Sequence, residues 1–305
     1  MFSAPAELTI YVLVGFFLGI QRTIISSSLI IMLSILNICF SIYFVNELGL
    51  NVKGVAFGTL LSAYITFFSF SVFTYFYFIK IFKVIPRFAY KKLLNFKKIL
   101  KLLIINFNIF IRTLLLTFSF FWITYLGSTL GEEYVAVNAV LLQLIFISSF
   151  FLDAYAFSTE GIIGYSLGKK SLKMFSSTVK NSLILSFVTG VLISIFFLFF
   201  AKEIINLITD LEFLRFLTYK YLIWVIFIPP IASIAYQLDG IFIGATQTKE
   251  LRNAMIVSVT IYLFLSVFLT KQLHNYGIWF SLFLFMILRA STLHFYFSKI
   301  LNKFK

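Results

Sequence analysis

Apolar residues gather along this chain into long unbroken stretches, and polar residues are mostly confined to the short segments between them. A helix of about 20 residues crosses the ~30 Å hydrocarbon core of a bilayer. The stretches lack the alternation of polar and apolar positions that barrel strands show, so helices are predicted. The predicted spans are 7–21, which is short, then 25–45, 54–79, 102–126, 134–163, 182–201, 219–245, 254–271 and 277–298.

The composition supports the same class of protein. Hydrophobic residues make up 61% of the chain, charged residues only 12%, and the mean hydropathy is +1.02. These values lie outside the range of soluble domains, so the prediction is an all-α polytopic membrane protein with the lipid bilayer as its surroundings. The single cysteine, Cys39, lies in an apolar stretch and is expected to be a buried thiol.

Basic residues are distributed unevenly between the two ends of the predicted helices. The segment from Lys80 to Lys101 carries eight Lys and Arg residues and no acid. Cytoplasmic loops retain such residues, so we expect a cytoplasmic C-terminus and a location in the bacterial inner membrane. The net charge of +14 then reflects topology and attraction to anionic lipid, and nucleic acid is not an expected partner.

Two stretches of the chain are nearly the same. GFFLGIQRT begins at Gly15 and GIFIGATQT at Gly240, and a single offset of 225 also aligns Pro5 with Pro230. The first three predicted helices therefore correspond to the last three, which indicates a parallel repeat of the kind found in secondary transporters. With a repeating unit of six helices, three more are expected before the first. The predicted domains are a half-lobe at 1–80, a basic linker at 81–101, a six-helix lobe at 102–298 and a basic tail at 299–305.

Several motifs resemble the DinF-like branch of the MATE (multidrug and toxin extrusion) transporters. They are SAPAELTIYVLVGFFLGIQ, NVKGVAFGTLLSAYIT, VAVNAVLLQL, LDAYAFSTEG, YLIWVIFIPP and LDGIFIGATQTKELRNAM. The resemblance implies a two-lobe helical fold of twelve helices, of which this chain would begin at the fourth. It also implies an antiporter that exports organic, often cationic compounds in exchange for protons or sodium by alternating access. No other cofactor, no metal and no obligate protein partner is expected.

Such exchange needs ionisable groups at membrane depth that bind either a cation or a proton. Most acids fall in predicted loops or at helix ends, including Glu250, which is predicted to lie in a cytoplasmic turn. The remaining acids are Asp153, Glu160 and Asp239. Asp153 and Asp239 are predicted at one depth, where they could share a cavity and a proton. Glu160 is seven residues past Asp153 and so lies on the same helical face. Arg112, well inside its own span, is the expected partner of one carboxylate.

Further residues are candidates for the wall of the cavity and for its motion. The polar candidates for the wall are Asn138, Gln143, Tyr236 and Gln237. Pro229 and Pro230 remove two backbone donors and must bend or break their helix, which makes them a candidate hinge. The Gly-x-x-x-Gly spacings at Gly15 and at Gly240 are expected to allow close helix packing.

Three alternatives stay open at this point. A flippase for lipid-linked precursors would share the two-lobe plan, but it would favour cavity arginines over carboxylates. A non-functional truncated fragment is the second. A membrane enzyme is the third, and against it the sequence shows no Ser/His/Asp set, no metal-spaced cluster and no phosphate-binding loop.

Overall fold

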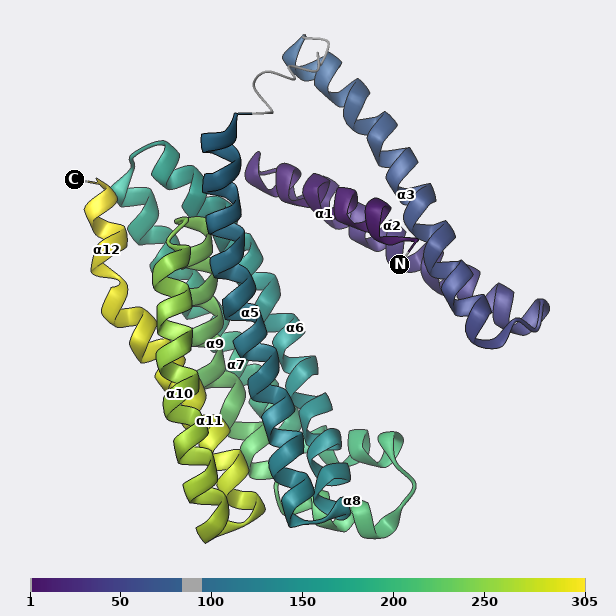
Figure 1. The fold of residues 1–305 in the computed structure, drawn as a ribbon, viewed down its shortest axis with the longest axis vertical. Coiled ribbons are helices and arrows are strands. Elements are labelled where there is room, and N and C mark those ends of the chain that lie inside the picture. Colours follow the sequence, from purple (N-terminus) through teal and green to yellow (C-terminus); the bar gives the residue numbers. More distant parts are fainter. Residues whose placement is uncertain (1, 84–94, 305) are drawn as a thin grey trace. The chain divides into compact units, whose positions relative to one another are not determined.

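The computed structural model describes residues 2–83 and 95–304, and every regular element in that part is helical (Figure 1). This confirms the predicted all-α fold. The main helices are α1 (Ala4–Gly19), α2 (Thr23–Ile42), α3 (Asn51–Phe82), α5 (Phe96–Leu130), α6 (Glu132–Gly168), α7 (Leu172–Ile208), α9 (Leu222–Gly244), α10 (Thr248–Leu273) and α11 (Asn275–Tyr296). The shorter elements are a π-helical turn η1 (Tyr43–Glu47), α8 (Glu212–Tyr219), α12 (Ser298–Leu301) and a 3₁₀ turn η2 (Asn302–Phe304).

Within the described residues, eight helices are long and apolar enough to cross a membrane, and α1 is a shorter apolar helix of 16 residues. Several helices extend well beyond the predicted spans, because a helix continues past the hydrocarbon into polar sequence. α5 begins inside the predicted linker, and residues 84–94 of that linker lie outside the described part. Sequence reasoning also missed α8, whose eight residues are too few to show as an apolar stretch.

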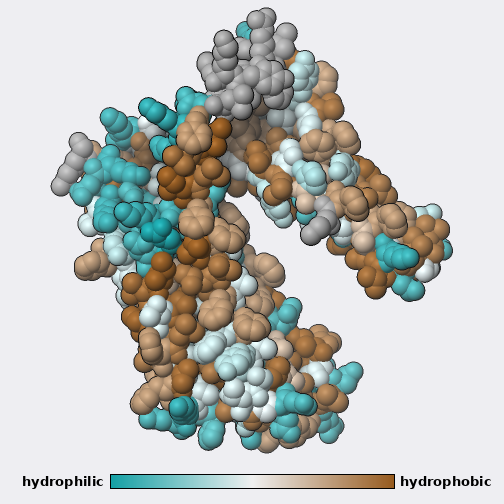
Figure 2. All heavy atoms as spheres, viewed as in Figure 1, coloured by the Kyte–Doolittle hydropathy of each residue, from teal (hydrophilic) through white to brown (hydrophobic). Residues whose placement is uncertain are grey.

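The chain divides into two compact units, Met1–Phe96 and Lys97–Lys305. In the second unit, a core of large side chains lies between α5, α6, α7, α9, α10 and α11. Trp279, Tyr262 and Phe285 are fully buried there. Figure 2 shows hydrophobic side chains over the middle of this unit and hydrophilic ones at its ends, as expected for a protein surrounded by lipid.

The first unit holds α1, α2 and α3. Its hydrophobic cluster is formed by Ile10, Phe17 and Leu29, with partly buried aromatic and aliphatic side chains packed against them. Cys39 on α2 is exposed, so the expectation of a buried thiol is wrong. An apolar neighbourhood in sequence does not decide which side of a helix is covered.

The two repeated stretches end in the same kind of turn, which α6 also has at Lys170 and Ser171. α1 ends with N–H groups of Gln21 and Arg22 donating to carbonyls three and five residues earlier, and α9 ends with the same bonds from Thr246 and Gln247. Gln21 and Thr246 both have a positive φ, of 60° and 53°. This is the Schellman arrangement, and the two turns are again 225 residues apart.

Small residues bring α6 and α9 into close contact. A Cβ at Gly240 would lie 2.6 Å from the carbonyl oxygen of Ala156, and one at Gly244 would collide with the backbone of Glu160. Only glycine permits this approach, so the spacing predicted to favour packing does so on α9. The contact fixes α6 beside α9 at the level where both helices carry acids.

Candidate functional site

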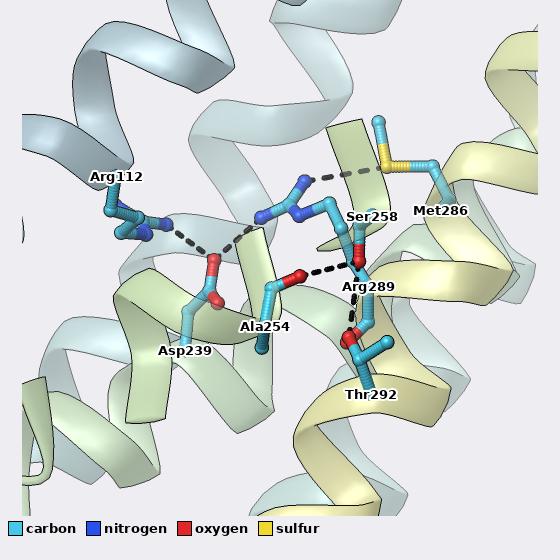
Figure 3. Close-up of polar contacts among 7 residues, drawn as sticks. All are labelled: Arg112, Asp239, Ala254, Ser258, Met286, Arg289 and Thr292. Carbon is cyan, nitrogen blue, oxygen red and sulfur yellow. Dashed lines mark hydrogen bonds and ion pairs between the residues drawn. The ribbon is translucent and has the colours of Figure 1, made fainter. Parts of the chain in front are cut away.

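Three helices of the second unit bring charged side chains to one point in its interior (Figure 3). Arg112 on α5 contacts Oδ2 of Asp239 on α9. Arg289 on α11 donates to the same oxygen, with Nη2 at 2.5 Å. One carboxylate oxygen thus serves two guanidinium groups, while Oδ1 of Asp239 has no hydrogen-bond partner among the described residues.

The cluster is largely shielded from its surroundings. Exposed fractions of the side chains are 5% for Asp239, 1% for Arg289 and 15% for Arg112. Buried ions are strongly destabilising when unpaired, and here the carboxylate compensates the arginines only in part. The formal charges of the three groups sum to one positive charge, so another neighbouring side chain must supply the negative charge that neutralises the cluster.

Neighbours on α9 and α11 fix the position of Arg289. Its guanidinium carbon lies 5.3 Å from the ring centre of Tyr236 and 5.8 Å from that of Phe285. Its Nη1 also lies 3.4 Å from the sulfur of Met286 (Figure 3). Aromatic faces attract cations, most strongly away from water. Arg289 is therefore held as part of the core, and Arg112 is the less enclosed arginine of the two.

Asp153 on α6 completes a group of four charges. Its side chain is partly buried and interacts electrostatically with Arg112, Asp239 and Arg289. It forms no ion pair or hydrogen bond with any residue that the structure describes. Formal charges of the four groups sum to zero, because Asp153 compensates the excess of the arginines. The structure thus places Asp153 near the pair formed by Arg112 and Asp239.

Glu160 lies two turns farther along α6. Its side chain is partly buried, and its backbone forms the surface against which Gly244 packs. It forms no ion pair with the described residues. The structure thus leaves Glu160 beyond the four-charge group, on the way to the α6–α7 turn.

The polar residues predicted for a cavity wall have different surroundings. Asn138 is buried and joins α6 to α11, donating to Asn275 at 2.8 Å and accepting from Trp279 at 2.8 Å. Gln237 is buried and accepts from Thr159 at 3.0 Å. Tyr236 covers Arg289, as described above, whereas Gln143 is exposed.

Pro229 and Pro230 lie inside an unbroken α9. Pro230 has no N–H for the carbonyl of Ile226 one turn earlier, and that carbonyl instead accepts from Ser194 of α7 at 2.5 Å. A Cβ at Gly190 would lie 2.9 Å from the Cα of Pro230. Helix α7 thus supplies both the space and the donor that this proline-containing segment requires.

Two results differ from the sequence analysis. Glu250 is not an acid of a solvated turn: it lies in the first turn of α10, is only 8% exposed, and pairs with Lys299 at 3.2 Å. The C-terminal helix α12 folds back over it, which the sequence pattern does not reveal. Arg289, the second arginine at Asp239, was absent from the predicted site. Its position within the apolar span 277–298 could have indicated that Arg289 has a buried acidic partner.

The MatE family model matches residues 109–270, which include Arg112, Asp153 and Asp239, while Arg289 follows the matched region. The chain belongs to the MatE family. The match covers more than half of the chain and begins inside α5, so the second unit carries the family signature.

MatE relatives and solved structures extend the likeness to both units. DNA damage-inducible protein F of Escherichia coli is 33% identical over 95% of this chain, and the chain covers 62% of that relative's length. A Vibrio cholerae MATE transporter, VcmN, shares the fold with a TM-score of 0.84 at 17% identity. The match covers 99% of this chain and 68% of the VcmN chain. A MOP superfamily transporter of Pyrococcus furiosus is described as having a binding pocket of reverse polarity. It matches with a TM-score of 0.78 at 16% identity, and the match covers 92% of this chain and 63% of that transporter.

Proposed function

We propose that this protein is a secondary active efflux transporter that exports organic cationic or amphipathic compounds in exchange for protons or sodium. It acts in the bacterial inner membrane with its basic C-terminal end in the cytoplasm. The observation that carries the proposal is the buried carboxylate of Asp239, shared by arginines of two other helices, with Asp153 close by. Ionisable residues within membrane spans typically mark ion and substrate pathways.

The shared carboxylate links proton binding to helix arrangement. Two guanidinium groups stabilise the ionised form of Asp239, so a proton binds there only in a conformation from which one arginine has withdrawn. A conformational equilibrium and a binding equilibrium linked in this way drive each other. Protonation of Asp239 therefore favours separation of α5 from α9.

Arg112 is the arginine that withdraws. Its side chain is 15% exposed against 1% for Arg289, and Arg289 is also held by two aromatic rings. Asp153 is in electrostatic range of Arg112 and accepts it after release. The proline-containing segment of α9, at Pro229 and Pro230, provides the place where the helix bends during this change.

A cationic substrate competes with Arg112 for Asp153. In the structure this carboxylate has no ion-pair partner among the described residues, so it is the acid open to an organic cation or to sodium. Glu160 on the same face of α6 extends the negative path toward the α6–α7 turn. The substrate and the released Arg112 cannot bind Asp153 at the same time. A proton that binds Asp239 and releases Arg112 therefore displaces the substrate, and this is the exchange of substrate for proton.

The proposal is tested by efflux of a cationic dye from proteoliposomes with an imposed proton or sodium gradient. Asp239→Asn removes the charge that both arginines contact, and we expect at least a tenfold loss of gradient-driven efflux. Asp210→Asn is the matched control, because Asp210 makes an exposed pair with Arg215 at 3.2 Å, and it should retain efflux. Equal efflux from both variants would contradict the assignment.

A flippase for lipid-linked anionic precursors is the second candidate, favoured by one observation. Two arginines converge on one carboxylate, so the immediate surroundings of Asp239 carry excess positive charge. The same proteoliposomes distinguish the two functions. Transfer of a fluorescent lipid-linked phosphate between leaflets, without dye efflux, would favour the flippase, whereas dye efflux without lipid transfer favours the exporter.

A further inference from the structure

A cavity of about 460 Å³ lies between α5 and α10, at the end of the second unit that carries the α10–α11 turn. Its volume is in the range that small-molecule sites occupy. Trp122 is ten residues past Arg112 on α5, which places the cavity about 15 Å along the helix from the charge cluster. We propose that this cavity binds a flat aromatic compound that carries a negative group.

Aromatic rings form one wall of the cavity in a fixed arrangement. The rings of Trp122 and Tyr125 stack with centroids 4.9 Å apart. Nε1 of Trp122 donates to Ser266 of α10 at 2.9 Å, which fixes the indole plane across the gap between the helices. Leu126 and Val267 add apolar surface beside it. Such a wall favours a flat ring system, because stacked aromatic pairs contribute beyond the area that they bury.

The opposite wall offers a donor that has no partner. Thr270 on α10 lines the cavity and is only 6% exposed, and its Oγ1 has no hydrogen-bond partner among the described residues. A buried hydroxyl without a hydrogen-bond partner is destabilising. A ligand oxygen in the cavity would satisfy it.

The charge at the cavity is positive. Lys271 and His274 line it, and no acid is among the lining residues that the structure describes, although α6 begins at Glu132 and Glu133, shortly after the lining residue Leu130. The C-terminal ends of α5 and α10 contribute partial negative charges of about half a unit each, which fall off within a turn. The full charge on the flexible Lys271 side chain is free to approach a sulfonate or carboxylate above the rings.

Equilibrium binding of naphthalenesulfonate to the purified chain in lipid nanodiscs tests the proposal, with the cation N-methylquinolinium as the ligand control of similar size. We expect saturable binding of the anion that is about tenfold weaker in Lys271→Gln, because a charge-assisted contact is lost. Trp122→Leu should weaken binding by a similar factor, and Thr270→Val by roughly fivefold. Lys220→Gln, at another exposed lysine over the ring of Phe216, should bind as the unchanged chain does.

Three outcomes would overturn the proposal. The first is affinity for naphthalenesulfonate that Lys271→Gln leaves unchanged while the variant melts like the original chain. The second is equal or tighter binding of N-methylquinolinium. The third is no saturable binding in nanodiscs, which would mean that acyl chains fill the cavity and that Trp122 and Tyr125 are interfacial anchors. No gradient is involved, so the result is independent of the transport function proposed above.

Discussion

The helices α1–α3 of the first unit and α9–α11 of the second share a sequence register and a turn, yet they differ in charge. At the offset of 225, Asp239 corresponds to Val14. Helices α3 and α11 begin at Asn51 and Asn275, and in that register Arg289 corresponds to Ile65. One copy thus carries a buried ion pair where the other carries apolar side chains. The difference shows that a repeated backbone can be kept while buried charges are placed in only one of the two copies.

The glycines of the two copies differ in the same way. In the second unit Gly240 and Gly244 meet the backbone of α6, whereas a Cβ at Gly15 or Gly19 would meet no described atom within 4 Å. Identical spacing therefore gives close packing only where a neighbouring helix lies against it. Likewise, Pro5 falls in the first turn of α1, where its missing N–H costs nothing, while its counterpart Pro230 lies in the middle of α9 and requires Ser194.

The largest expected effect comes from breaking the charge cluster. Arg289→Met leaves Arg112 as the one arginine for both Asp239 and Asp153, so a buried negative charge is uncompensated, and we expect a loss of about 3 kcal/mol in the free energy of unfolding. Ile65→Met is the matched change in the first unit and should cost less than about 1.5 kcal/mol. Denaturant unfolding in detergent micelles, followed by circular dichroism, measures both. Equal losses would show that the ion pair does not distinguish the two copies.

A smaller effect is expected from the glycines. Gly240→Ala forces α9 away from Ala156 and should destabilise the protein by about 1–3 kcal/mol. Gly15→Ala, its counterpart on α1, meets open space and should stabilise that helix by roughly 0.5–1 kcal/mol. Opposite signs of the change in melting temperature would confirm the contrast. A loss in both variants would mean that another segment covers Gly15 in the folded protein.

The smallest expected effect concerns the proline-containing segment. Ser194→Ala removes the donor to the carbonyl of Ile226 and should cost about 1 kcal/mol. Ser28→Ala is the control on α2, because the exposed Ser28 donates only to Ile24 of its own helix, and it should change stability by less than about 0.5 kcal/mol. Hydrogen exchange of the amides in α9 locates the effect. Unchanged exchange rates on both sides of Pro230 would contradict the role given to Ser194.

Several features of the molecule could be read from the sequence alone. Apolar stretches of sufficient length predicted the helices, because a backbone in lipid must satisfy its own hydrogen bonds. The shared register at Gly15 and Gly240 could be read from the sequence, and the structure adds that each copy is followed by a Schellman turn, at Gln21 and at Thr246. Depth along the helix predicted Asp153 and Asp239 at one level, because rise per residue is nearly constant, and the two carboxylates do interact electrostatically. The expectation that Arg112 pairs with a carboxylate came from its position inside an apolar span, and its contact with Asp239 agrees.

Only the tertiary structure decided how these helices are rotated and which neighbours they meet. Sequence spacing gives the distance along one helix but not the side that faces another, so it did not predict that Arg289 shares the oxygen bound by Arg112 or that Asp153 stays unpaired among the described residues. The burial of Glu250 depends on a short helix 48 residues later, from Ser298 to Leu301, and the exposure of Cys39 depends on what covers α2. Each outcome is a long-range contact, set by the packing of whole helices and not by the residues next to it in the chain.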